Sequence, residues 1–573
     1  MTSHGVRSIL LTATYLLLLT ACGGGGSAQK QPARAIQPGP DPLYALQWHL
    51  NNVGQTGGVP GMDINVMPVW GCMVGESCGE SDGGLRGEGV RIAIVDDGLE
   101  VRHPDLWMNV VPGASLNFLT GGRDPTPGLI DDQDIDDPND SHGTAVAGLV
   151  AARDFNSEGG RGVAPRAQLV GINLLKSPTL SNQASALTHD LARVAVSNNS
   201  WGATDGSGQL QPADFSWRQA IESGLQQGRN GLGTVYVWAA GNGARVWENG
   251  RAVAVDNANY DGRTNFYGVM AIGAVDHAGR KTDYSEDGAN LWLVAPGGSG
   301  HCSSSLVTTD LSGPGGLNDG AKPDDLLEHP DYTRCMAGTS AATPLVSGVV
   351  ALVLQARPEL TWRDVRLVLA ESARRHGLAA SDWSSPRPGY RNPLRHSHRY
   401  GFGLVDAAAA VALAHDWALL PAQKVFPPPV SSDGPDTTRL VASPIPKGDT
   451  EGLADTLWIS GSGINFIEWV DIEFASSHSY AGNLEITLTS PAGTVSRLAL
   501  PHGCRNSRSG QWIADCTGAI TGPDGVWRWR FGSARHLGEA ADGAWTLRVV
   551  DAVDQPFSGS GDWQSWRLII RGH

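Results

Sequence analysis

The chain has 573 residues, of which 41% are hydrophobic, and its formal net charge is −16 at pH 7. A chain of this length and apolar content is not disordered, and at roughly 100–250 residues per domain it should contain two folded domains. The acidic balance argues against a nucleic-acid partner and suits cationic partners better, although acidity that only maintains solubility is the simpler alternative.

Residues 1–21 predict an export signal. A basic residue precedes an apolar run from Ile9 to Leu19, which is too short to span a bilayer. The sequence Leu19-Thr20-Ala21-Cys22 resembles a bacterial lipobox, which implies cleavage before Cys22 and a lipid on its sulfur. That resemblance predicts a protein anchored to the cell envelope, at the outer membrane or cell surface. An ordinary secretory signal is the alternative. Residues 22–40, which contain four consecutive glycines, predict a flexible tether.

Residues 41–420 alternate short apolar runs with helix-like stretches. The apolar runs are residues 92–95, 169–172, 234–238 and 269–274. This alternation predicts an α/β domain with a mostly parallel sheet and helices on both of its faces. Residues 338–356 are long and apolar enough to resemble a membrane span. Their Ser, Thr and Pro residues, and their place inside a globular pattern, favour a buried core helix.

Residues 421–445 are rich in Pro, Ser and Asp and predict a linker. Residues 446–573 then show short β-rich segments separated by Gly, Asn, Pro and Asp, which predict an all-β sandwich. The segments are residues 467–474, 484–488, 526–531, 545–550 and 566–570.

Six of the seven cysteines remain once Cys22 is set aside, and an even number in an exported chain predicts disulfides. Their order along the chain suggests the pairs Cys72–Cys78, Cys302–Cys335 and Cys504–Cys516, although order alone does not fix the connectivity. No Cys-x-x-Cys motif or Cys/His cluster has the spacing of zinc ligands, so a zinc or thiol enzyme is not expected.

Three motifs supply the residue types of nucleophilic acyl transfer. "VDDG" places Asp96 at a strand end, whereas "DSHGTAVAG" and "GTSAATP" place His142 and Ser340 at helix starts. A carboxylate that orients a histidine base beside a serine nucleophile is the machinery of serine hydrolases, and the order Asp, His, Ser is that of subtilisin. A helix N-terminus favours the anion formed when Ser340 attacks a carbonyl. Asn242 in "WAAGNGA" supplies an amide for the oxyanion hole.

These motifs, together with "NSWG", "NYDGRTN", "YSED" and "LTWRDV", resemble those of the subtilases, and specifically the kexin and furin branch, the proprotein convertases. The resemblance extends from about residue 41 to the C-terminus. The tail, through "GNLEITLTSPAGT" and "DGAWTLRVVD", resembles that branch's P domain, a jelly-roll-like sandwich. The resemblance implies a subtilisin-like fold with a three-layer parallel sheet. It also implies a calcium-dependent serine endopeptidase that cuts proteins after dibasic or basic residues.

The resemblance separates the roles of the two adjacent aspartates. Asp96 would orient His142, while Asp97 would bind a basic side chain at P2, the second residue before the scissile bond. The alternative is that Asp97 is an ordinary turn residue before Gly98.

Other acids map onto the family's P1 pocket, which holds the residue directly before the scissile bond. The pocket residues are Asp205, Asp256 and Asp261, and the backbone that would pair with an extended substrate is Ser200, Trp201 and Gly202. Carboxylates select Lys or Arg by charge pairing. Two departures from the family stand out. Arg263 occupies a position usually held by Tyr and should repel a P4 Arg. A single Asp205 stands where the family has an acidic pair, which leaves the choice between Arg and Lys open.

Calcium is the metal that the resemblance implies, and hard cations of this kind take oxygen ligands. The first site maps onto the side chains of Asp41, Asp105 and Asn156 and the carbonyls of Arg153, Glu158 and Gly160. The second site, behind the P1 pocket, maps onto Asp205, Asp256 and Glu286. For each acid taken singly, a solvated surface position is the alternative.

The predicted α/β domain begins soon after Cys22, so there is no room for the long N-terminal propeptide that subtilases usually carry. The resemblance therefore implies folding that relies on a separate chaperone or on the P domain. Two other functions remain as alternatives. One is a broad-specificity subtilase whose acids serve calcium alone, and the other is an inactive lipoprotein whose sandwich mediates adhesion.

Overall fold

The computed structural model describes residues 40–72, 83–127, 140–248, 251–313, 315–318, 324–387, 393–427, 438–552 and 557–573. The predicted export signal, Cys22 and Cys78 lie outside these residues.

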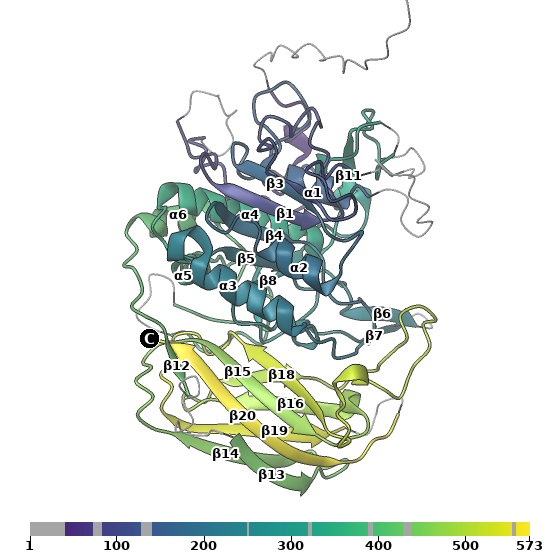
Figure 1. The fold of residues 1–573 in the computed structure, drawn as a ribbon, viewed down its shortest axis with the longest axis vertical. Coiled ribbons are helices and arrows are strands. Elements are labelled where there is room, and N and C mark those ends of the chain that lie inside the picture. Colours follow the sequence, from purple (N-terminus) through teal and green to yellow (C-terminus); the bar gives the residue numbers. More distant parts are fainter. Residues whose placement is uncertain are drawn as a thin grey trace, which may run out of the picture. The chain divides into compact units, whose positions relative to one another are not determined.

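A parallel sheet of seven strands, in the order β2-β3-β1-β4-β5-β8-β9, forms the centre of the α/β domain within the described residues (Figure 1). The strands are β1 (Arg91–Asp96), β2 (Leu116–Asn117), β3 (Gln168–Asn173), β4 (Val194–Asn199), β5 (Val235–Ala239), β8 (Val269–Val275) and β9 (Leu291–Pro296). Nearly every strand residue is buried, as expected for a parallel sheet covered on both faces. The four predicted apolar runs coincide with β1, β3, β5 and β8, so this prediction is confirmed.

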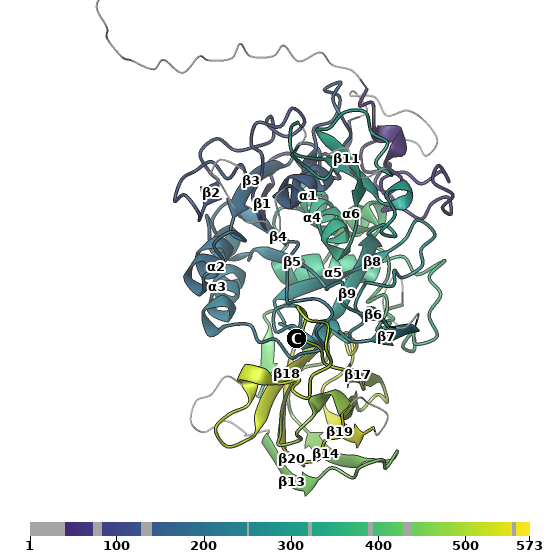
Figure 2. The same cartoon turned by 90° about the vertical axis from the view of Figure 1, so that its right-hand side faces the viewer.

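Helices cover both faces of this sheet. In the described part of the chain they are α1 (His142–Ala151), α2 (Leu180–Leu187), α3 (Phe215–Gly231), α4 (Thr339–Ala356), α5 (Trp362–Ser372) and α6 (Ala407–His415). Figure 2 shows α2 and α3 on one side of the sheet and α1 and α4 on the other. Among the described helices, α4 alone has the length and hydropathy of a membrane span, but 83% of that stretch is buried inside the fold. It contacts β4, β5, β8 and β9, so it is the predicted core helix.

Shorter elements complete the α/β domain. They are the strand pairs β6 (Arg245–Glu248) with β7 (Arg251–Ala254) and β10 (Leu306–Thr309) with β11 (Tyr332–Met336), and the single-turn helices η1 (Tyr44–Leu46), η2 (Ala258–Tyr260) and η3 (Cys302–Ser304). The predicted disulfide between Cys302 and Cys335 is confirmed and joins η3 to β11. Cys72 is also disulfide-bonded, but its expected partner Cys78 is not described.

The second domain is the predicted β-sandwich, made of two antiparallel sheets. One sheet has the order β12-β20-β15-β18, with β13 also paired to β20, and the other has the order β14-β19-β16-β17. Its elements are β12 (Lys424–Phe426), β13 (Thr438–Pro444), β14 (Leu453–Ile459), β15 (Ile467–Ser476), η4 (Ala481–Asn483), β16 (Leu484–Thr489), β17 (Val495–Ala499), η5 (Gly518–Ile520), β18 (Trp527–Ser533), β19 (Gly543–Asp551) and β20 (Asp562–Gly572). The predicted Cys504–Cys516 disulfide is confirmed.

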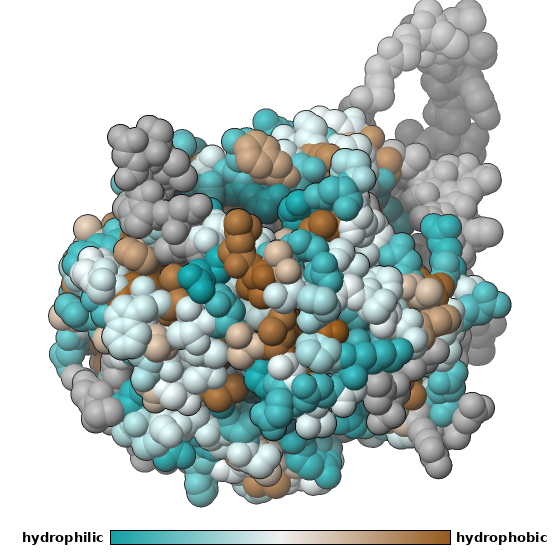
Figure 3. Space-filling view, turned by 90° about the horizontal axis from the view of Figure 1, so that it is seen from below, coloured by the Kyte–Doolittle hydropathy of each residue, from teal (hydrophilic) through white to brown (hydrophobic). Residues whose placement is uncertain are grey.

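The predicted linker, residues 421–445, contains two strands of the sandwich, which corrects that prediction. Both β12 and β13 pair with β20, while residues 428–437 are not described. The sequence pattern did not predict β13, because most of this outer strand is exposed, including Leu440 at 83%. It therefore lacks the alternation of buried and exposed residues that identifies an inner strand. Figure 3, in which the sandwich faces the viewer, shows a largely polar surface with a small apolar group near its centre.

The sandwich packs against the α/β domain through buried polar contacts within one compact unit. Arg363 on α5 pairs with Glu468 on β15 at 2.5 Å, and both side chains are nearly inaccessible. Burial by itself would raise the pKa of Glu468, but hydrogen bonds from Arg363 and His573 outweigh it and lower this pKa to about 2. The side chain of Asn259 binds both the N–H and the carbonyl of Gly532. These contacts join α5 and η2 of the α/β domain to β15 and β18 of the sandwich, and breaking the buried ion pair would leave a charge uncompensated.

Candidate active site

The predicted catalytic side chains meet at the carboxyl edge of the parallel sheet. Asp96 is the last residue of β1, and Asn242 follows the end of β5. Helices α1 and α4 begin at the same edge and carry His142 and Ser340 in their first turns. The carboxyl ends of parallel strands and the N-termini of the helices that follow them share one edge, so residues distant in sequence share one site.

Asp96 holds the imidazole of His142. Its Oδ1 lies 2.8 Å from Nδ1 of His142, and the carboxylate is fully buried whereas the His142 side chain is 34% exposed. The same oxygen accepts a hydrogen bond from the N–H of Asp97 at 2.9 Å. This arrangement fixes the ring and leaves Nε2 on the opposite side, which is the geometry that a general base requires.

Asp97 binds the N-terminus of α1. Its two oxygens accept the N–H groups of His142 at 3.0 Å and Gly143 at 2.7 Å. Ser141, which precedes the helix, makes no side-chain cap, so Asp97 satisfies donors that the helix leaves unpaired. Burial, and then repulsion from Asp96, raise the pKa of Asp97 well above its usual range. The sequence analysis missed this role. Each oxygen keeps a second lone pair, so binding of a P2 side chain stays a prediction.

Gly143 lets α1 approach the end of β1. A Cβ atom at this position would lie 2.1 Å from the carbonyl oxygen of Gly98 and 2.9 Å from Cβ of Asp96. Any larger residue would push His142 away from Asp96. The glycine directly after the histidine in "HGT" is the sequence signal for this contact.

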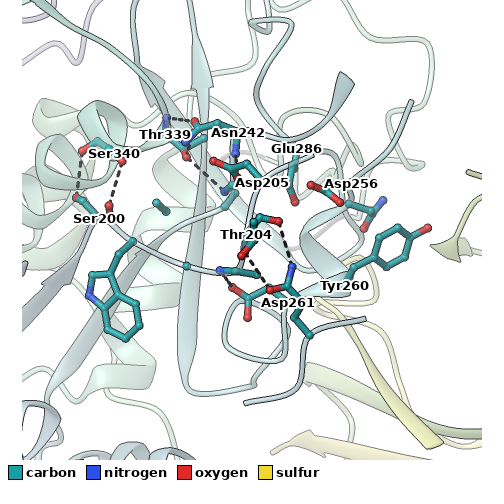
Figure 4. A pocket seen from close by; sticks show the side chains of 18 of the residues that line it. Ser200, Thr204, Asp205, Asn242, Asp256, Tyr260, Asp261, Glu286, Thr339 and Ser340 are labelled. Atoms are coloured by element: carbon teal, nitrogen blue, oxygen red, sulfur yellow. Dashed lines mark hydrogen bonds between the residues drawn. The ribbon is translucent and has the colours of Figure 1, made fainter. Parts of the chain in front are cut away.

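Ser340 lies beside the strand end that is predicted to pair with substrate. Its Oγ donates to the carbonyl of Ser200 at 3.0 Å, and Oγ of Ser200 donates to the carbonyl of Ser340 at 3.1 Å (Figure 4). Pro344 lacks the N–H that would otherwise bind the Ser340 carbonyl within the helix, so that carbonyl can accept from Ser200. The contact between Ser340 and His142 that a triad needs stays a prediction, and a hydroxyl can rotate to make it.

Asn242 is fixed by the residue before the nucleophile. Its Oδ1 accepts hydrogen bonds from the N–H of Thr339 at 2.8 Å and from Oγ1 of Thr339 at 2.9 Å. The N–H of Asn242 donates to Asp205 at 2.8 Å. Burial raises the pKa of Asp205, and hydrogen bonds from the backbone and side chain of Asn242 oppose that rise. The oxygen of Asn242 is held by Thr339 and its amide also hydrogen-bonds Asp205, so donation to an oxyanion at Ser340 stays a prediction. The sequence analysis missed Thr339.

A pocket opens beside Ser340, and all the residues predicted for substrate binding except Asp97 line it (Figure 4). They are Ser200, Trp201, Gly202, Asp205, Asp256 and Asp261. Asp261 forms an ion pair with Arg263 at 3.3 Å, so its charge is compensated. The Arg263 side chain is only 18% exposed and lies 5.6 Å from the ring of Trp201. Asp261 therefore contributes less negative charge to the pocket than the sequence suggested.

The second predicted calcium cluster also lines this pocket. It consists of Asp205, Asp256 and Glu286. Burial raises the pKa of all three carboxyls, and repulsion from Asp205 adds to the rise for Asp256 and Glu286. Among the described residues, no Lys or Arg forms an ion pair with these carboxylates. Glu286 is buried, Asp256 is half-buried and Asp205 is exposed. Three acids without a described basic partner match the donor set of a hard divalent cation.

The first predicted calcium cluster is also brought together. The backbone N–H of Asn156 donates to Asp41 at 3.3 Å, and its side chain donates to Asp105 at 2.8 Å. The N–H of Gly160 donates to Asp105 at 3.2 Å, and Arg153 and Glu158 belong to the same loop. However, Arg161 pairs with Asp41 at 2.5 Å. Burial raises the pKa of Asp41 to about 6 despite this pair. This set fits a calcium ion less well than the second, and the sequence analysis missed Arg161.

Comparison with known families places both domains. The family described as "Subtilase family" matches residues 87–403, and the family described as "Proprotein convertase P-domain" matches residues 467–570. Furin-like protease 2 of Drosophila melanogaster is 32% identical over 93% of this chain and 28% of its own length. Proprotein convertase subtilisin/kexin type 7 of Mus musculus is 31% identical over 93% of this chain and 61% of its own length. The chain thus spans less than two thirds of either relative.

Solved structures agree with this comparison. The serine protease of Aeromonas sobria superposes with a TM-score of 0.76 at 30% identity, covering 95% of this chain and 99% of that one. The same protease in complex with its chaperone ORF2 gives a TM-score of 0.76 at 29% identity, covering 94% and 96% of the two chains. The predicted fold is therefore confirmed over nearly the whole chain.

Proposed function

Because the chain belongs to the subtilase family of serine proteases, we propose that it is a calcium-dependent endopeptidase that cleaves proteins after basic residues, and best after a pair of them. The observation that carries the proposal is the pocket beside Ser340, where the carboxylates of Asp205, Asp256 and Glu286 lack a basic partner among the described residues. A P1 Lys or Arg would supply that partner, and Arg would add a bidentate hydrogen bond.

The reaction would follow from the arrangement of the chain's own residues. Ser340 Oγ attacks the scissile carbonyl carbon while Nε2 of His142 takes its proton, and Asp96 stabilises the imidazolium that forms. The N–H groups at the start of α4 and the amide of Asn242 stabilise the oxyanion. His142 then returns the proton to the departing amine. Water, activated by His142, releases the acyl group from Ser340.

The second cluster would hold the calcium ion, through Asp205, Asp256 and Glu286. Bound there, calcium would supply positive charge that keeps these carboxylates ionised. Three carboxylates and one divalent cation leave one negative charge, and Asp261 is already compensated by Arg263. The pocket would thus keep a net charge opposite to that of a basic P1 side chain.

Cleavage of three fluorogenic peptides, ending in Lys-Arg, Ala-Arg and Ala-Phe, tests the specificity. We expect Ala-Arg to exceed Ala-Phe by about 10²-fold in kcat/KM, because an unfilled acidic pocket leaves its carboxylates unpaired. We expect Lys-Arg to exceed Ala-Arg through a contact with Asp97. Equal cutting of all three peptides would instead indicate a broad-specificity subtilase. Failure to react with a serine-directed fluorophosphonate would favour the inactive, adhesive alternative.

We also propose that the mature chain is anchored to the cell envelope through a lipid on Cys22. The lipobox-like sequence before this cysteine supports the proposal. Wild-type protein expressed in a Gram-negative host should incorporate radiolabelled palmitate and sediment with membranes, whereas Cys22→Ser should do neither. Equal labelling of both proteins would contradict the anchor.

A separate chaperone is the third part of the proposal. It is supported by the Aeromonas sobria protease, whose structure was solved with a chaperone. The denatured chain refolded alone should recover little of its activity. Full recovery would show that no chaperone is needed.

A further inference from the structure

A loop of the sandwich reaches into the wall of the acidic pocket. We call residues 204–211 the pocket segment, because it carries Asp205 and several other lining residues, and residues 502–516, closed by the Cys504–Cys516 disulfide, the disulfide loop. Hydrogen bonds join the two segments, and they include two between backbones and one from a side-chain ring. These are Arg505 N–H to Ser207 carbonyl at 2.7 Å, Leu210 N–H to Cys516 carbonyl at 3.0 Å, and the His502 ring with Gly208 carbonyl at 2.8 Å.

The pocket segment is held on its other side by the α/β domain. Asp256 accepts hydrogen bonds from the N–H groups of Gly206, Ser207 and Gly208. The segment therefore lies between a carboxylate of the pocket and the disulfide loop. Its Asp205, which lines the pocket, binds the backbone N–H of Asn242.

The contact is closest at Gly208. Its φ is +66°, and a Cβ atom there would lie 2.3 Å from the carbonyl oxygen of Gly503 and 3.1 Å from the ring of His502. Gly206, two residues earlier, has a similar φ of +71°, but its Cβ would meet only Val246, at 3.4 Å. An alanine would therefore be strained by the positive φ at either position, but only at Gly208 would its side chain also collide with the disulfide loop.

His502 links the loop to a second wall of the pocket. Its ring stacks on Tyr260 with centroids 4.5 Å apart, and Tyr260 lines the pocket. The Tyr260 hydroxyl donates to the carbonyl of Leu500 at 3.1 Å. Burial lowers the pKa of His502, which favours the neutral ring. His502 therefore supports the pocket as a neutral ring. Elsewhere in the loop, the Trp512 indole N–H donates to the Glu248 side chain on β6 at 3.0 Å.

We propose that the disulfide loop of the sandwich positions the wall of the P1 pocket, so that the second domain determines how tightly the P1 side chain is held. His502 and the backbone of the disulfide loop have a positioning role, since they affect the P1 side chain only through the pocket segment. The inference rests on the proposed function only in taking this pocket as the P1 site. The inference applies whichever P1 residue the enzyme prefers, provided that it prefers one.

Two alanine variants separate this role from general destabilisation. Gly206→Ala measures the cost of a side chain at positive φ in the pocket segment. Gly208→Ala adds the collision with the disulfide loop. We expect Gly208→Ala to raise KM for the preferred P1 peptide about tenfold more than Gly206→Ala does, because small displacements of binding groups have large effects. The rate of inactivation by a small fluorophosphonate, which does not use the pocket, should be the same for both variants.

A double variant alters the same contact on the sandwich side. Cys504→Ser combined with Cys516→Ser opens the loop and should also raise KM and flatten the P1 profile, with fluorophosphonate reactivity retained. Equal KM values for the two glycine variants would overturn the inference. A loss of fluorophosphonate reactivity that parallels the rise in KM in every variant would also overturn it. A wild-type profile that prefers a non-basic P1 residue would refute the proposed specificity alone. The loop would still be tested by the change in that profile.

Discussion

Replacing Asp96 with asparagine is expected to lower kcat about 10⁴-fold while the protein stays folded. Oδ1 of Asp96 lies 2.8 Å from Nδ1 of His142 inside the fold, where no water can replace it. An asparagine amide can present an N–H to this nitrogen and select the wrong tautomer of the ring. Its missing charge also leaves the imidazolium unstabilised. Steady-state kinetics on the Ala-Arg peptide, with circular dichroism to verify folding, measure the effect.

Asp97→Asn is the matched control, since it changes the adjacent carboxylate in the same way. We expect a moderate loss for Ala-Arg, because an amide oxygen still accepts one of the two N–H groups of α1, and loss of a cap costs about 1 kcal/mol. We expect a further loss of about tenfold for Lys-Arg, where the charge that faces a P2 cation is gone. Equal losses for both peptides would leave Asp97 as a helix-capping residue alone. A loss as large as that of Asp96→Asn would contradict the proposed division of roles.

Removal of calcium is expected to lower the unfolding temperature by roughly 2–4 °C and to abolish most of the activity. At a calcium concentration about 100 times its Kd, binding stabilises the folded state by about 2.7 kcal/mol. Without the ion, the carboxylates of Asp205, Asp256 and Glu286 repel one another in the pocket. Differential scanning fluorimetry and peptide cleavage, each with a chelator and after calcium is restored, measure both effects.

The two candidate sites can be compared by matched amide substitutions. Glu286→Gln removes a ligand from the cluster that lacks a basic partner, so it should remove most of the calcium-dependent rise in unfolding temperature. Asp105→Asn should have a smaller effect, because Arg161 already compensates Asp41 in the first cluster. Unchanged stability on chelation would contradict calcium dependence. Full restoration by magnesium would contradict the choice of ion.

The sequence was sufficient to predict those features of the fold and site whose physical cause is local. Strands such as β1 and β8 could be predicted because a strand buried on both faces needs a continuous apolar run. The helix after Gly338 could be recognised as a core element from its polar interruptions and its context. The motifs around Asp96, His142 and Ser340 could be combined because a short strand end or helix start determines the exposure of each side chain.

The sequence failed where a hydrogen bond joins residues that are far apart. Asp97 binds α1 across 45 residues, and His502 binds Gly208 across 294 residues and a domain boundary. Thr339 is adjacent to the nucleophile, yet its role depends on Asn242, which is 97 residues away. No periodicity encodes such partners. An exposed outer strand such as β13 also escaped detection, because few of its residues are buried.

The sequence by itself therefore determined the order of the two domains, the sheet strands and the residue types available for acyl transfer, because burial of apolar side chains follows local pattern. Only the tertiary structure showed which acids have their charge compensated by a basic partner. Arg263 compensates Asp261 and Arg161 compensates Asp41, whereas Asp256 and Glu286 have no described basic partner. Electrostatic interactions depend on distance and burial in space, which a linear sequence does not specify.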